Sequence, residues 1–166
     1  MSNETTGQKS SIVSRTCCFT GHRDVPTDRM EYVRRELTRE IGEAVADGYR
    51  HFISGFAEGV DLLAASVVLE LKKDWPSLTL EASIPYLKRF DKIMDNPETR
   101  AMLLSCAGFG VWSVEYHKDC FMVRNRKMLS MSSRVIAVYD GRDGGGTVQT
   151  LRFAHTMEVE QRVIKI

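Results

Sequence analysis

The 166-residue chain lacks the features that would point to a membrane or to a large charged partner. No apolar run is long enough to cross a bilayer, and the polar segment 1–15 has no apolar core of a signal peptide. We expect this segment to be a flexible leader, followed by a single domain over residues 16–166. The formal net charge is only +1, so composition gives no broad electrostatic attraction to nucleic acid.

Cysteine is also scarce, with four residues whose spacing does not match a metal site. We therefore predict no bound metal. Cys17 and Cys18 are neighbours on an expected strand, so their side chains should point to opposite faces of a sheet. Buried reduced thiols are typical of cytosolic proteins, and we expect a cytoplasmic location without membrane association.

Two common nucleotide-binding motifs are missing. No lysine follows the last glycine of the segment 144–147, as a Walker A loop requires, and no G-x-G-x-x-G segment follows the first expected strand. The chain instead alternates strand-like and helix-like patterns. Strands are expected at 16–20, 51–54, 78–84, 109–114, 134–139 and 162–166, and helices at 27–47, 57–73, 88–107 with a break near Pro97, 119–132 and 146–157. This alternation predicts an α/β fold with a mainly parallel sheet and helices on both faces.

Four short loops follow expected strands and lead into expected helices. They are Thr20–Arg23, Ser54–Asp61, the stretch 116–125 and Asp140–Thr147. In such a sheet, ligands bind beyond the carboxyl ends of the strands, where the strand order reverses. If the strand at 109–114 lies beside the strand at 16–20, which is an assumption, all four loops line one crevice.

The loop at 54–61 has the most specific pattern. Gly55 lets the chain turn sharply out of the sheet. Ala57 and Gly59 have small side chains or none, so the backbone at the helix start can approach a ligand closely. Asp61 lies in the first turns of the helix, where a carboxylate suits the dipole or accepts a ribose hydroxyl. The alternative interpretation is a tight turn in which Asp61 is a local cap.

Three consecutive glycines, Gly144, Gly145 and Gly146, come before Thr147 at the start of another expected helix. Consecutive backbone N–H groups and a hydroxyl at a helix start have the composition of a phosphate cradle. A flexible surface loop is the alternative.

Charged and aromatic side chains flank these loops. Arg23 has the planar fork that binds phosphate, and Arg124 is expected to clamp a phosphate or carboxylate, with a solvated side chain as the alternative for Arg124. His22 either contacts a ligand or hydrogen-bonds the neighbouring loop. Trp112 and Tyr116 either stack on a base or belong to the core.

The segments FTGHR at 19–23, SGFAEGVD at 54–61, RNRKM at 124–128 and DGRDGGGT at 140–147 together resemble the SLOG superfamily, in particular its YpsA-like branch. The likeness covers residues 16–166 and implies a three-layer Rossmann-like fold with a pocket for a nucleotide or nucleotide-derived signal. The SGxAxGxD segment is similar to a loop of the DprA proteins, which bind single-stranded DNA. The Arg-Asn and Gly-Gly-Gly-Thr segments are similar to motifs of the LOG phosphoribohydrolases, which cleave the N-glycosidic bond of nucleoside 5′-monophosphates.

The chain departs from the hydrolases at one place. Gln149 and Thr150 stand where those enzymes carry glutamates, one of which is catalytic, and glutamine cannot take a proton as a carboxylate does. We therefore predict binding or sensing of a nucleotide-like ligand without strong catalysis, and we assign no catalytic residue. Hydrolysis of nucleoside monophosphates is the alternative.

Nucleic acid is a disfavoured partner, because the sequence has no basic stretch interleaved with aromatic residues. The expected partner is a small nucleotide-like molecule, no further cofactor is assigned, and the sequence leaves a homodimer open. The predicted ligand-binding residues are Gly21, His22, Arg23, Ser54, Gly55, Ala57, Gly59, Asp61, Arg124, Asn125, Gly144, Gly145, Gly146, Thr147 and Gln149.

Overall fold

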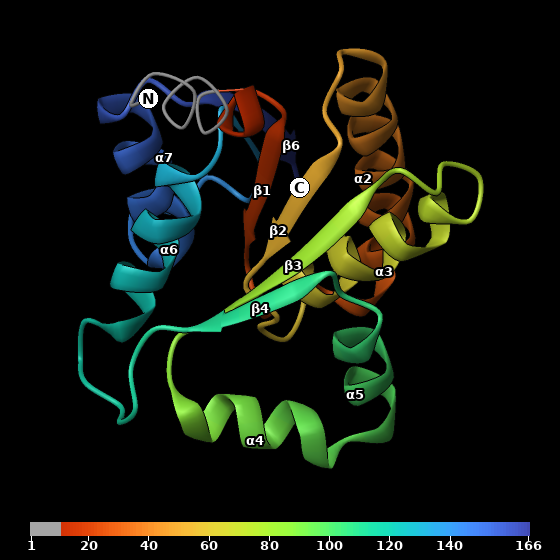
Figure 1. Ribbon diagram of the computed structural model, residues 1–166. Helices are drawn as coiled ribbons and strands as arrows, with labels where there is room; N and C mark the ends of the chain where they lie inside the picture. Colours follow the sequence, from red (N-terminus) through yellow and green to blue (C-terminus); the bar gives the residue numbers. More distant parts are fainter. Residues whose placement is uncertain (1–10) are drawn as a thin grey trace, which may run out of the picture.

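The computed structural model describes residues 11–166, and a six-stranded sheet lies at its centre (Figure 1). The strands are β1 (Thr16–Gly21), β2 (His51–Ser54), β3 (Thr79–Ile84), β4 (Gly108–Val111), β5 (Arg134–Tyr139) and β6 (Glu160–Lys165). All neighbouring strands pair in parallel. The predicted α/β fold is confirmed, and its sheet is entirely parallel.

Helices cover both faces of the sheet, which gives the three layers of a Rossmann-like fold. They are the 3₁₀ turn η1 (Thr27–Arg29), α2 (Met30–Ala46), α3 (Val60–Lys72), α4 (Leu87–Asp95), α5 (Pro97–Leu104), α6 (Cys120–Ser130) and α7 (Gly146–Thr156). Helices α2 and α3 pack on one face and α6 and α7 on the other (Figure 1). The expected break near Pro97 separates α4 from α5, because the Asn96 side chain caps the new helix and proline suits its first turn.

The alternation of side chains along β1 divides the core into two halves. Cys17 and Phe19 are buried with α2 and α3, whereas Cys18 is buried with α6 and α7. The two cysteines therefore point to opposite faces, as predicted. All four cysteines are free thiols.

The assumed strand order is wrong. The observed order is β4-β3-β2-β1-β5-β6, so β4 lies at the edge beside β3, and β5 is the strand that flanks β1. Burial explains this placement. Nearly all of β5 is buried, as suits a central strand covered on both faces, whereas all four residues of β4 are at least partly exposed. The order reverses between β1 and β5.

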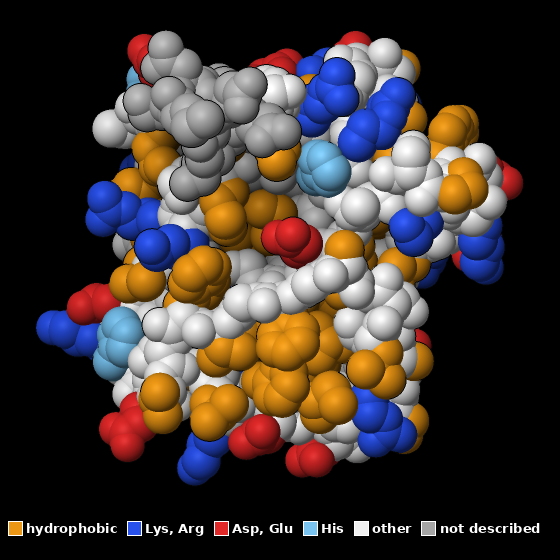
Figure 2. All heavy atoms as spheres, viewed as in Figure 1, with side chains coloured by type: hydrophobic (Ala, Val, Ile, Leu, Met, Phe, Trp, Pro, Cys, Tyr) orange, Lys and Arg blue, Asp and Glu red, His pale blue; other side chains and the backbone are white. Residues whose placement is uncertain are grey.

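The edge strand β4 packs against α4. Figure 2 shows an apolar area in this part of the molecule, where the ring of Phe109 lies 5.1 Å from that of Phe90 on α4. This contact helps to hold α4 just beyond the carboxyl ends of the strands, next to the cavities of the candidate site.

The described part of the predicted leader contacts the sheet region. The Arg15 carbonyl accepts hydrogen bonds from the backbone N–H groups of Arg50 and His51, while residues 1–10 lie outside the described chain. None of the described helices is long and apolar enough to span a membrane.

Candidate functional site

A cavity of 410 Å³ opens at the carboxyl ends of β1 and β5, where the strand order reverses. Three of the four predicted loops reach it directly, and the stretch after β4 reaches it through α6. The predicted site residues that line it are Gly21, His22, Arg23, Ala57, Asp61, Arg124, Asn125, Gly145, Gly146 and Thr147. Convergence does not depend on the strand order we assumed, because α6 crosses back over the sheet to reach the reversal.

The glycine-rich loop leaves open space at the start of α7. Gly145 has a φ of 102°, which suits glycine, and a Cβ atom built on Gly144, Gly145 or Gly146 would meet no atom within 4 Å. The N-terminal N–H groups of α7 lack partners within the helix and carry the positive end of its dipole. This part of the cavity has the shape and polarity of an anion site.

His22 joins the loops that follow β1 and β5. The Asp140 backbone N–H donates to His22 Nε2 at 3.2 Å, and Thr147 Oγ1 lies 3.5 Å from Nδ1. Burial lowers the pKa of His22, which favours the neutral ring, while the Asp140 carboxylate opposes the shift. The contact with the neighbouring loop is therefore one of the two roles that the sequence left open.

Arg142 bridges the same two loops at the mouth of the cavity. Its Nη2 lies 2.6 Å from the Asp140 carboxylate and 3.2 Å from that of Asp24. The hydrogen bond from Arg142 lowers the pKa of Asp140 to about 2. These salt bridges connect the loops after β1 and β5 at the wall of the cavity, which Asp24 and Arg142 both line.

The lowered pKa of His22 makes a prediction about acid. As the pH falls through 6.5, the unfolded chain takes up the proton before the folded protein does, so the free energy of unfolding should decrease. Urea unfolding at pH 7.5 and 5.5 should show a smaller pH effect in His22→Asn than in the unmodified protein. The exposed His155 is the control, and an equal reduction in His155→Asn would contradict the prediction.

Two of the predicted glycines serve packing between loops. A Cβ atom on Gly59 would lie 2.6 Å from the His22 carbonyl oxygen, and one on Gly21 would lie 2.5 Å from the Val60 side chain. We expect Gly59 to open backbone to a ligand; in the structure it packs against the β1 loop and also lines an adjoining cavity. Ser54 is similarly internal, because its Oγ donates to the Asp61 carbonyl at 2.8 Å.

The buried side chain of Arg124 hydrogen-bonds the backbone that follows β2 and the backbone of β3, and it also lines the cavity. Its Nη1 donates to the carbonyl oxygens of Gly55 at 2.7 Å and Ser83 at 3.1 Å, and its Nε donates to Asn125 at 2.8 Å. Within residues 11–166 its Nη2 makes no hydrogen bond, so the two N–H groups on Nη2 remain available to a ligand. Burial raises the pKa of nearby Asp61, and the charge of Arg124 opposes that rise.

Phe121 and Arg89 are site residues that the sequence did not reveal. The guanidinium carbons of Arg23, Arg89 and Arg124 lie 4.8, 5.8 and 5.9 Å from the centre of the Phe121 ring. Among residues 11–166, no carboxylate lies within 4 Å of Arg23 or Arg89. The spacing along the sequence could have indicated Phe121, because it precedes Arg124 by three residues and therefore shares a helix face with it. Arg89 lies on α4, which follows β3, and it lines an adjoining cavity on the other side of Phe121.

Some predicted residues lie elsewhere. Gln149 lines a separate hollow between α6 and α7, and Gly144 lies outside both this hollow and the cavity. Trp112 is far from the reversal and donates from Nε1 to Ser83 Oγ at 2.8 Å. Tyr116 is exposed and lines neither cavity, and its ring lies 6.4 Å from that of Phe121.

The fold is that of a parallel α/β protein, and its cavity lies at the topological switch point, where sheets of this kind bind their ligands. The chain belongs to the YpsA family, described as the YspA SLOG family, which matches residues 17–164. The described fold and the sequence motifs thus agree on the superfamily that the sequence resembled.

Individual relatives give the same result. UPF0398 proteins of Bacillus thuringiensis (strain Al Hakam) and Bacillus cereus (strain AH187) are each 31% identical over 116 residues, or 67% of this chain. The chain spans only 62% of the length of these relatives. A solved structure of DNA processing protein A from Helicobacter pylori, described for its single-stranded DNA binding mode, matches with a TM-score of 0.63 and 20% identity. That match covers 94% of this chain and 67% of the other, and it shows a shared fold.

Proposed function

We propose that this protein binds a phosphate-bearing nucleotide or nucleotide-derived ligand in the cavity between the ends of β1 and β5, without strong catalysis. The observation that carries the proposal is the cluster of Arg23, Arg89 and Arg124 around Phe121; Arg23 and Arg124 line this cavity beside the open glycine loop of α7, and Arg89 stands at its edge with the adjoining cavity. Like charges repel at this spacing, so a cluster with so few carboxylate partners favours an anionic ligand.

The chemistry of the donors favours phosphate among anions. Arginine forks match phosphate oxygens, and the N–H groups at a helix start add donors together with the helix dipole. Asp61 and Asn125 line the same cavity and offer an acceptor and an amide to the hydroxyls of a sugar. Membership of the SLOG family supports a nucleotide-type ligand in this position.

Thermal unfolding with added ligand tests the proposal. AMP at 100 times its Kd should stabilise the protein by about 2.7 kcal/mol, while adenosine, which lacks the phosphate, should do much less. Arg23→Ala should weaken AMP binding, because exposed Arg23 supplies charge to the site; the exposed Arg126 on α6 gives a matched control, Arg126→Ala. No shift with AMP or ADP at millimolar concentration would contradict the proposal.

One observation favours the alternative function, hydrolysis of nucleoside monophosphates. Asp61 is a buried carboxyl in the cavity whose pKa is raised by burial, a property that suits a proton donor. Thr150 lies near the cavity instead of a glutamate, with its hydroxyl accepting from Asn125 at 3.1 Å. Chromatography of the same AMP samples should show intact nucleotide, whereas release of adenine that Asp61→Asn abolishes would establish hydrolysis.

A further inference from the structure

A second cavity of 470 Å³ adjoins the first. It lies between α3, α4 and α5 at the carboxyl ends of β2 and β3. Ala57, Phe121 and Arg124 line both cavities, so the arginine cluster stands at their junction. The function proposed above uses the first cavity and the arginine cluster at this junction, and it leaves the rest of the second cavity without a role.

The second cavity has apolar walls and more cationic than anionic side chains in its lining. Leu62, Ile84 and Met102 contribute apolar wall. The charged lining residues are the cations Arg34, Arg89, Lys92 and Arg124 and the carboxylates Glu58 and Glu98. Arg34 and Lys92 have only weak partners, because Arg34 donates to Ser66 Oγ at 3.3 Å and Lys92 lies 3.4 Å from the exposed Glu58 carboxylate. Such a lining suits a flat, largely apolar group attached to an anion.

We propose that the two cavities form one site for a dinucleotide, a ligand with two bulky halves joined through phosphate groups. One half lies toward the glycine loop of α7, the linking phosphates lie over the arginine cluster, and the other half lies in the second cavity. This inference rests on the proposed function, since it needs phosphate at the cluster. Ligand pockets commonly measure about 300–1,000 Å³, and either cavity alone is near the size for one half.

The comparison of AMP with diadenosine diphosphate by calorimetry tests this inference. The dinucleotide should bind at least about tenfold more tightly than AMP, because it fills both cavities. Ser66→Phe, which fills the second cavity from α3, should remove this advantage and leave AMP binding within about twofold. Glu70→Phe, at an exposed position one turn further along α3, should change neither affinity.

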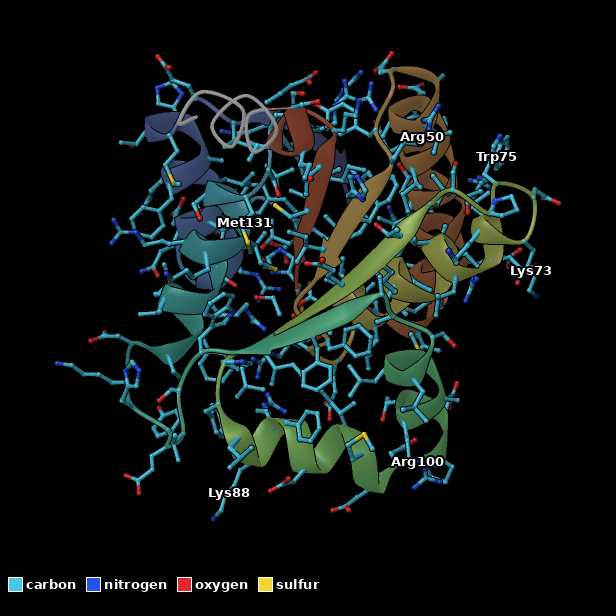
Figure 3. The ribbon with its side chains drawn as sticks, in the orientation of Figure 1. Arg50, Lys73, Trp75, Lys88, Arg100 and Met131 are labelled. Carbon is cyan, nitrogen blue, oxygen red and sulfur yellow. The ribbon has the colours of Figure 1, made fainter. Side chains whose placement is uncertain are left out.

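A charge reversal at Arg34 gives a second test, which leaves the volume of the second cavity unfilled. Arg34 is exposed at the rim of the second cavity, and Arg34→Glu should weaken the dinucleotide several-fold without affecting AMP. Lys88 points away from the cavities into solvent on α4 (Figure 3), so Lys88→Glu is the control.

The outcomes separate the two proposals. Equal affinities for AMP and the dinucleotide would overturn the two-cavity site while leaving nucleotide binding intact. Loss of AMP binding in Ser66→Phe with a normal unfolding temperature would also overturn it, because AMP would then occupy the second cavity. No binding of either compound would overturn both proposals.

Discussion

Replacing Arg124 with alanine is expected to lower the free energy of unfolding by about 3–5 kcal/mol and to remove most nucleotide binding. Its guanidinium donates to the Gly55 and Ser83 carbonyl oxygens from a buried position, and it is the main charge opposing the burial of Asp61. Alanine leaves these acceptors without donors and Asp61 without its nearest compensating charge. Urea unfolding measures the loss of stability, and calorimetry with AMP measures the loss of affinity.

The pH dependence of the stability loss in Arg124→Ala separates the effect of the lost charge near Asp61 from the effect of lost packing. Burial already raises the pKa of Asp61, and removal of Arg124 should raise it further. Since the folded protein then binds the proton more tightly than the unfolded chain, the loss caused by Arg124→Ala should be smaller at pH 5 than at pH 8. Adding Asp61→Asn should recover part of the stability at pH 8.

The neighbouring helix position provides the control for Arg124. Arg126 is exposed on α6, where its guanidinium lies 4.9 Å from the centre of the Phe153 ring. Arg126→Ala should change stability by no more than about 0.5 kcal/mol and leave AMP binding unchanged. Equal losses in the two variants would show that Arg124 has no special role in tying the strands together.

Gly59→Ala is expected to cost about 3 kcal/mol of stability, the second largest effect we anticipate. Gly59 has φ 83° and ψ −125°, a conformation that L residues rarely adopt. The new methyl group would also lie 2.6 Å from the His22 carbonyl oxygen, which is backbone and cannot rotate away. Both the strain and the clash must be relieved by moving the β1 loop.

Gly42 on α2 is the matched control for this substitution. It has no atom within 4 Å of a built Cβ and lies inside a helix, so Gly42→Ala should stabilise the protein by about 0.5–1 kcal/mol. Opposite signs for the two glycines are expected in urea unfolding. A loss of less than about 0.5 kcal/mol in Gly59→Ala would contradict the packing role of this residue.

The sequence by itself determined the elements and most of the residues that line the cavity at the strand-order reversal. Apolar periodicity and the position of glycine and proline report local preferences of the chain, so they predicted the strands, the helices and the division between α4 and α5. The loops at β1, β2 and β5 could be found for the same reason, since the carboxyl ends of parallel strands share one edge. The open loop at Gly145 and Gly146 required only the identity of consecutive residues.

Only the tertiary structure decided which residues meet across the sheet. Strand order depends on how the helices pack, and β4 moved to the edge because its partly exposed residues suit it better than the centre. Gln149 and Thr150 are adjacent in sequence, yet a helix turns successive side chains apart by about 100°, and only Thr150 faces Asn125. The assembly of Arg23, Arg89 and Arg124 around Phe121 joins three separate segments, so it follows from packing and from no local pattern.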